Sequence, residues 1–180
     1  MGVKSLARVA TRYPQSAFAG FTQSLQSEWQ YLSRCVPGVG KHLQPVEDAI
    51  WEHLIPALFQ TTPDKVPEDM RQLLTHGVKQ GGLNIRDPVA AADGLNESST
   101  EACTALVTSL TQDSRLDAQG HAQCVRQAST KARKERVKKE TATVEAQAEA
   151  ARPAAKRRLK RIGFTGACWS LVPNRLNSTT

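Results

Sequence analysis

Residues 115–163 read RLDAQGHAQCVRQASTKARKERVKKETATVEAQAEAARPAAKRRLKRIG and form a densely basic stretch in the second half of the chain. A helix that buries a full face repeats large apolar side chains every three or four residues. This stretch mostly has alanine at such positions, and large apolar side chains such as Val125, Val137 and Val144 are sparse. We therefore expect one long helical arm, broken near Pro153, whose surface mostly meets water or a charged partner.

The cations of this arm form two clusters, one on each side of Pro153. Contact with a phosphate backbone requires several long cationic side chains, and it carries no sequence information by itself. Glu135 and Lys139 stand four residues apart and are expected to support the helix as an ion pair. A charge run is also often only a solvated helix surface, but two clusters favour nucleic acid. The candidate nucleic-acid-binding residues are Lys131, Arg133, Lys134, Arg136, Lys138, Lys139, Lys156, Arg157, Arg158, Lys160 and Arg161.

The charge divides the chain into two unlike parts. Residues 1–100 carry nine Lys or Arg against ten Asp or Glu, whereas residues 101–180 carry fifteen against seven. The net charge is therefore −1 in the first part and +8 in the second, which gives the +7 of the whole chain. A basic excess confined to one part is typical of proteins that bind a polyanion, most often nucleic acid.

The location of the protein is predicted from three features of the sequence. The four cysteines Cys35, Cys103, Cys124 and Cys168 form no Cys-x-x-Cys pair, so a zinc or redox site has no support. The first ten residues lack the apolar run of a signal peptide, and no stretch approaches the roughly 18–20 apolar residues that cross a bilayer. We expect an intracellular protein of the nucleus or cytoplasm, not secreted and without a membrane partner. The second basic cluster also has the composition of a nuclear import signal.

Amphipathic helices dominate the first 112 residues. Residues 15–34 have the clearest pattern, and their aromatic stripe is interpreted as facing a core instead of a partner, because the chain has few aromatics. A second helix is expected over residues 43–58, with a kink or an end at Pro56. A third helix is expected between Pro67 and Gly77, with Gly77 as its left-handed stop and His76 favoured by the helix dipole. The stripe consists of Phe18, Phe21, Leu25, Trp29, Leu32 and Val36.

Residues 80–88 read QGGLNIRDP and predict a turn that leads into a new helix. Two glycines free the backbone for a tight turn, and Leu83 and Ile85 alternate as in an extended segment that plugs a core. Asp87 followed by proline is typical of a helix N-cap and first helical position. The helix is expected to stop near Ala92, and Ser98 to Glu101 have the form of a capping box that starts another.

No residue set has the spacing of a catalytic or metal site. The chain lacks the paired-Asp turn that holds two metal ions in a polymerase, and the neighbours Glu47 and Asp48 would diverge on a helix. We therefore expect no catalytic residue, no metal, no cofactor and no small-molecule substrate, so that the chain is not an enzyme. The histidines also lack ligand spacing; they are His42, His53, His76 and His121.

Six segments resemble, in the same order, the region just after the polymerase palm in retroelement reverse-transcriptase polyproteins. They include RYPQSAFAGF and LQSEWQYLSR between residues 12 and 34, and LQPVEDAI and IPAL between residues 43 and 58. GGLNIRDP at 81–88 is similar to the family's Gly-Gly-Leu-Gly-Ile-Arg segment, with Asn84 in place of a glycine, and ACWSLVP at 167–173 is similar to its Ala-Trp-Leu-x-x-x-Pro stretch. The resemblance implies a thumb-like helical region that grips template–primer duplex, without the catalytic aspartates, which lie upstream.

These patterns together predict a mostly α-helical chain with a small helical globule, a long basic helical arm and an extended apolar tail. The expected units are a thumb-like domain over 1–112, the arm over 113–163 with its break near 153, and a tail over 164–180 that we expect to be truncated. The expected function is that of a non-catalytic nucleic-acid-binding fragment of a retroelement reverse transcriptase, an RNA-directed DNA polymerase, that contacts template–primer phosphates. Two alternatives stay open: a module whose arm pairs with another helix, which the poor heptad pattern disfavours, and an inert transposon remnant.

Overall fold

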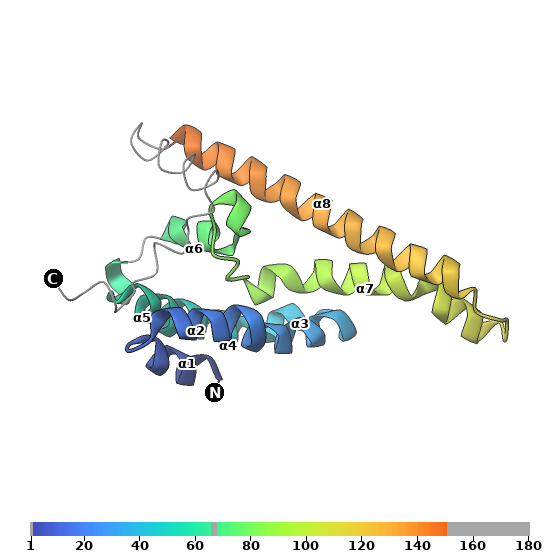
Figure 1. The fold of residues 1–180 in the computed structure, drawn as a ribbon, viewed down its shortest axis with the longest axis horizontal. Coiled ribbons are helices and arrows are strands. Elements are labelled where there is room, and N and C mark those ends of the chain that lie inside the picture. The colour runs from blue at the N-terminus through green and yellow to red at the C-terminus, as the bar shows by residue number, and fades with distance from the viewer. Residues whose placement is uncertain (1, 66–67, 151–180) are drawn as a thin grey trace.

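The computed structural model of the chain describes residues 2–65 and 68–150. Within these residues every regular element is helical, which confirms the prediction of a mostly α-helical chain (Figure 1). A globule of short helices is followed by a hairpin of two long helices, α7 and α8. The expected break near Pro153 and the expected tail over 164–180 lie outside the described residues.

The N-terminal part of the globule consists of helix α1 (Gly2–Ala10) and a longer helical rod that packs on it. The rod is continuous through α2 (Pro14–Gly20), the π-helical turn η1 (Phe21–Leu25) and α3 (Gln26–Cys35). This confirms the helix expected over 15–34. A π-helical turn widens the helix by one residue per turn, so it changes the face that the following residues present.

The aromatic stripe of this rod lies in the core only in its first part. Phe18, Phe21 and Trp29 are at most 7% exposed, and the rings of Phe21 and Trp29 are 5.8 Å apart. Leu32 and Val36 are 48% and 45% exposed, so the expectation that the stripe is buried throughout is wrong. Helix α3 packs on α7, and its buried residues are Trp29 of the stripe and two polar residues outside it, Gln26 and Ser33.

A second helical rod supplies the centre of the core. It runs through α4 (Gln44–Ala49), the π-helical turn η3 (Ile50–Leu54) and α5 (Ile55–Phe59), after the short 3₁₀ turn η2 (Val39–His42). Pro56 lies in its last turn, and the helix ends at Phe59, before the left-handed Gln60, so the expected end of the helix near Pro56 is confirmed. The fully buried residues of this rod are Ile50, Leu54, Ile55 and Leu58.

The segment between the globule and the hairpin contains the 3₁₀ turn η4 (Pro63–Lys65), α6 (Glu68–Thr75) and the 3₁₀ turn η5 (Val78–Gln80). Gly77 was expected to be left-handed but is extended, with φ −63° and ψ 156°. The left-handed residues are instead Gly81 and Asn84, with φ of 86° and 56°. Glycine and asparagine are the residues that adopt this conformation most readily. The left-handed stop expected at Gly77 is therefore wrong, whereas Gly81 lies in the turn expected at the two glycines.

The extended residues that the sequence predicts after this turn dock on the end of α6. The N–H groups of Leu83 and Ile85 both donate to Leu74 O, at 3.3 and 3.0 Å, and Asn84 N donates to His76 O at 2.8 Å. The side chains of Leu83 and Ile85 are 2% and 0% exposed. The predicted burial of these two side chains is therefore confirmed, and hydrogen bonds to the end of α6 fix their backbone.

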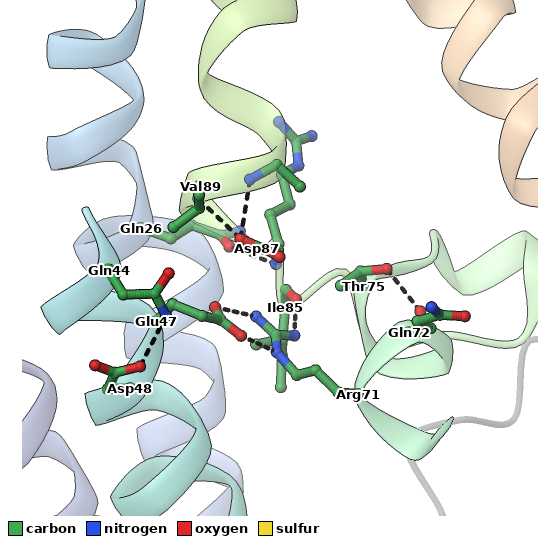
Figure 2. Close-up of polar contacts among 12 residues, drawn as sticks. Gln26, Gln44, Glu47, Asp48, Arg71, Gln72, Thr75, Ile85, Asp87 and Val89 are labelled. Carbon is green, nitrogen blue, oxygen red and sulfur yellow. Dashed lines mark hydrogen bonds and ion pairs between the residues drawn. The ribbon is translucent and has the colours of Figure 1, made fainter. Parts of the chain in front are cut away.

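A buried ion pair joins α4, α6 and this extended segment (Figure 2). Arg71 on α6 donates from Nε to Glu47 Oε1 at 2.5 Å and from Nη2 to Glu47 Oε2 at 2.6 Å. Its Nη1 donates to Ile85 O at 2.7 Å. The side chains of Arg71 and Glu47 are only 12% and 13% exposed. One guanidinium therefore connects three segments that are distant in the sequence.

Helix α7 (Pro88–Thr111) starts at the predicted cap, because Asp87 Oδ1 accepts hydrogen bonds from Val89 N at 2.8 Å and Ala90 N at 3.1 Å. The expected stop near Ala92 and restart at Ser98 are wrong, since the helix is continuous. Hydroxyl groups inside a helix can bond the carbonyl one turn back instead of capping a new helix. Thr104 does this, with Oγ1 donating to Thr100 O at 3.0 Å.

Helix α8 (Ala118–Ala150) turns back along α7 instead of standing apart from the globule (Figure 1). At about 1.5 Å per residue it is about 50 Å long, against about 36 Å for α7. Its far end reaches the η5 region, where Gly77 N donates to Glu140 Oε2 at 3.2 Å. The arm expected to protrude from the globule therefore packs on another helix of the same chain. None of the helices that the structure describes has the length and apolar character to cross a membrane.

His76 lies in the core and does not act as a charged group at a helix end. It is 4% exposed, and its Nδ1 has no hydrogen-bond partner among the described residues. Burial lowers the pKa of His76 below its ordinary value of 6.5, and the nearby carboxylate of Glu140 opposes this effect. A buried imidazole without a partner is favoured in its neutral form. The interpretation based on the helix dipole is therefore wrong.

The lowered pKa of His76 predicts that acid destabilises the fold. Because the folded state disfavours protonation, stability that is present above pH 6.5 is lost as the pH falls through 6.5 toward the lowered pKa. We expect urea unfolding to show a larger loss of unfolding free energy between about pH 8 and about pH 5.5 in the natural chain than in His76→Gln. Identical losses in the two chains would mean that His76 does not couple folding to protons.

Candidate nucleic-acid interface

The six predicted cations of the first basic cluster all lie on α8 and are all exposed to solvent. Because α8 is held by α7 along one side and by Gly77 near its end, these side chains extend from a fixed helix. The cations are Lys131, Arg133, Lys134, Arg136, Lys138 and Lys139. The second predicted cluster lies outside the described residues; it contains Lys156, Arg157, Arg158, Lys160 and Arg161.

Two of the six cations form ion pairs within the chain. Lys131 Nζ lies 3.2 Å from Glu101 Oε1 on α7, with side chains 59% and 52% exposed. An ion pair this exposed is worth little and exchanges easily with another anion. Arg136 Nε lies 3.3 Å from Glu140 Oε1, and the Glu140 side chain is only 12% exposed. This pair replaces the expected pair of Glu135 with Lys139, which is not formed in the described part of the chain.

The other four cations of the cluster have no carboxylate partner within ion-pair distance among residues 2–65 and 68–150. These residues, which we call the unpaired cations of α8, are Arg133, Lys134, Lys138 and Lys139. An open groove on the same helix is lined by Lys131 and Lys134 together with Arg126, a cation that the sequence analysis did not select. Polar groups of Gln123, Gln127 and Thr130 also line it, together with one carboxylate, that of Glu135. Such a surface offers several donors to phosphate oxygens along one helix.

A further cation, Arg86, lies half-buried where α3, the extended segment and α8 approach one another. Its Nη1 donates to Gln30 Oε1 at 3.5 Å, and its Nε donates to Asn84 Oδ1 at 3.4 Å. Both distances are long for hydrogen bonds, and both acceptors are neutral. Burial lowers the pKa of Arg86, the positive charges of Arg136 and Arg34 lower it further, and only Glu140 opposes them.

Arg34 and Arg86 were not selected from the sequence, because each is isolated among polar residues far from the basic arm. One signal was available for Arg86. Arg86 lies between two residues with fixed positions, the buried Ile85 and the helix cap Asp87, so its side chain must stay close to the fold. Nothing local to Arg34 indicates its place beside Arg86, which depends on how α3 meets the extended segment.

Comparison of the chain with protein-family models, with curated proteins and with solved structures finds no match. In the described residues, no group of three or more His, Cys, Asp or Glu side chains is gathered so that it could hold a metal ion. The features that remain as a basis for function are therefore the exposed basic face of α8 and the half-buried arginine beside it.

Proposed function

We propose that this protein binds nucleic acid through its phosphate backbone, using the exposed cations of α8. The observation that carries the proposal is the set of four unpaired cations on one fixed helix. Packing of α8 on α7 fixes the backbone that carries these cations, so only their side chains need to be ordered when phosphates are contacted. Contacts of this kind give affinity without base recognition, and the binding should be independent of sequence.

We further infer that the chain is a non-catalytic, post-palm region of a retroelement reverse transcriptase and acts inside the cell, in the nucleus or cytoplasm. The ordered sequence resemblance supports this inference. The left-handed backbone of Asn84 supports it too, because the resembling family segment has glycine at that position. In such a protein the α7–α8 hairpin would contact template–primer duplex, and the chemistry would be supplied by aspartates elsewhere.

Pairing of the arm with a partner helix is less well supported. The side of α8 that carries the buried Ala128 and the half-buried Ala132 is already packed on α7. The solvent-facing side is charged and lacks the apolar repeat of a helical interface. A second helix would therefore have to displace α7 or bind across unpaired cations.

The proposal predicts a large loss of affinity when the unpaired cations are removed. In the variant Arg133→Gln/Lys134→Gln/Lys138→Gln/Lys139→Gln, glutamine keeps a good helix former at each position while removing the charge. We expect its affinity for a generic DNA duplex at about 50 mM salt to fall on the order of a hundredfold. Fluorescence anisotropy with a labelled duplex measures this loss, and circular dichroism checks that the helix content is unchanged.

The matched control is Lys4→Gln/Arg8→Gln/Lys41→Gln/Lys79→Gln, which removes the same charge from exposed sites off α8. We expect this control to lose much less affinity than the α8 variant. Equal losses in the two variants would show that only the net charge matters. No measurable binding by the natural chain would refute the proposed function.

A further inference from the structure

We propose that Arg34, Arg86 and Arg136 form a binding site for one phosphate group where α3, the extended segment 81–87 and α8 meet. The phosphate could come from a nucleic-acid backbone or from free inorganic phosphate, and both present the same tetrahedral oxygens. As a contact to nucleic acid the site rests on the function proposed above. Binding of free phosphate does not depend on that function.

The first argument is that Arg86 is half-buried and forms no ion pair with a carboxylate in the described part of the chain. A guanidinium carries five N–H donors, and the acceptors within reach are the neutral oxygens of Gln30 and Asn84, at 3.5 and 3.4 Å. A partly buried charge is costly unless it is paired, so an anion from outside the chain would satisfy it.

The second argument is that α3 carries Arg34 on the same face as the two glutamines that contact Arg86. Gln26 and Gln30 occupy one face of α3; Gln26 Oε1 accepts from Arg86 N at 3.4 Å, and Gln30 accepts from the Arg86 guanidinium. Arg34 is one helical turn further along the same face. Its backbone oxygen accepts a hydrogen bond from Asn96 Nδ2 at 3.2 Å, which fixes this turn of α3 to α7.

The third argument is that hydrogen bonds connect Arg136 on α8 to the segment that holds Arg86. Asn84 accepts from Arg86 Nε and donates from its backbone to His76 O, and the next residue, Gly77, is bonded to the carboxylate that pairs with Arg136. Arg136 Nε bonds Glu140 Oε1 at 3.3 Å, while the other oxygen of Glu140 accepts from Gly77 N at 3.2 Å. The side chain of Arg136 is still 44% exposed, so its outer N–H groups remain accessible. Glu140 therefore positions Arg136 and offsets only part of the local positive charge.

The electrostatic effects on Arg86 agree with this placement of the three cations. The charges of Arg136 and Arg34 both lower the pKa of Arg86, and Glu140 is the one carboxylate that opposes them. Three guanidinium groups against one carboxylate leave two positive charges uncompensated. Planar guanidinium groups match the oxygens of phosphate in pairs, whereas an ammonium acts only as a point charge. Phosphate is thus the anion that best fits this set.

The site is tested by titrating the full chain with inorganic phosphate in a calorimeter, at an ionic strength held constant with chloride. We expect saturable binding of phosphate, at least tenfold weaker binding in Arg86→Gln, and no change in the control Arg8→Gln. Removing an uncompensated charge should leave the fold intact, so thermal unfolding of Arg86→Gln in chloride should occur at the same temperature or higher. Phosphate binding that is absent, non-saturable or equal in Arg86→Gln would overturn the proposal.

A second titration separates the two sources of phosphate and keeps the site distinct from the α8 interface. The variant that lacks the four unpaired cations retains all three arginines of the site, so it should bind inorganic phosphate as the natural chain does even if it no longer binds duplex. Loss of phosphate binding in that variant would overturn the site. If Arg86→Gln also makes the slope of log duplex affinity against log salt concentration shallower by about 1, the site binds a phosphate of the nucleic-acid backbone. If duplex binding is unaffected, it takes free phosphate.

Discussion

We expect Arg71→Met to lower the free energy of unfolding at neutral pH by about 3–5 kcal/mol. The substitution removes the cation that bonds both oxygens of Glu47 and the carbonyl of Ile85 (Figure 2). Because the Glu47 side chain is only 13% exposed, its carboxylate would remain in the interior without a partner. Urea unfolding followed by circular dichroism measures the loss.

The loss should depend on pH in a defined direction. Burial raises the pKa of Glu47 above its ordinary value of 4.5, and Arg71 opposes this effect in the natural chain. Without Arg71 the folded state takes up a proton at Glu47 at higher pH than the unfolded state does. The deficit of Arg71→Met should therefore be largest at neutral pH and shrink as the pH falls toward 4.5.

The double variant Glu47→Leu/Arg71→Met supplies the control. Replacing both partners of a buried ion pair with apolar side chains is often neutral or stabilising, so we expect it to regain most of the lost stability. If Arg71→Met lowered the free energy of unfolding by less than about 1 kcal/mol, the pair would behave like an ion pair on the protein surface, and it would not hold the three segments together.

We expect Gly82→Ala, which adds one methyl group to the turn, to lower the free energy of unfolding strongly. A Cβ at Gly82 would lie 2.5 Å from Leu73 O and closer still to His76 O, and both are backbone atoms of the α6 end. These atoms cannot rotate away as a side chain does, and the backbone of the extended segment is itself bonded to Leu74 and His76. We expect a loss of about 3 kcal/mol or more in unfolding free energy, as for a severely overpacked core.

Gly94→Ala is the matched comparison, because a Cβ at Gly94 on α7 meets no atom within 4 Å. Alanine is preferred to glycine inside a helix by roughly 1 kcal/mol, so this variant should be slightly more stable than the natural chain. Equal effects of the two substitutions in thermal unfolding would contradict the close packing of the turn against α6.

Local patterns in the sequence were sufficient for much of the fold. Leu83, Ile85 and Asp87 behave as expected, because alternation and capping depend on neighbouring residues. The return of α8 onto α7 was not predicted. Helix α8 contacts α7 through small residues such as Ala128, which is 4% exposed. A helical face made of alanine has no repeat of large apolar side chains, so the sequence pattern did not indicate that this face is buried. The exposure of Leu32 likewise depends on which face of α3 meets α7.

The candidate interface was only partly predictable for the same reason. The cations of α8 are consecutive in sequence, so their density alone identified them. Arg34 and Arg86 come from separate elements, and only the packing of α3, the extended segment and α8 places them beside Arg136. A search for charge runs cannot find a site assembled from isolated residues.

The salt dependence of duplex binding tests the account most directly. Each phosphate contact contributes about 0.9 to the slope of log affinity against log salt concentration for a DNA duplex. Between about 50 and 200 mM salt, we expect a steep slope for the natural chain, and a slope shallower by about 3 to 4 in the variant that lacks the four unpaired cations of α8. A natural chain whose binding ignores salt, or an α8 variant with an unchanged slope, would contradict the claim that α8 is a phosphate-binding surface.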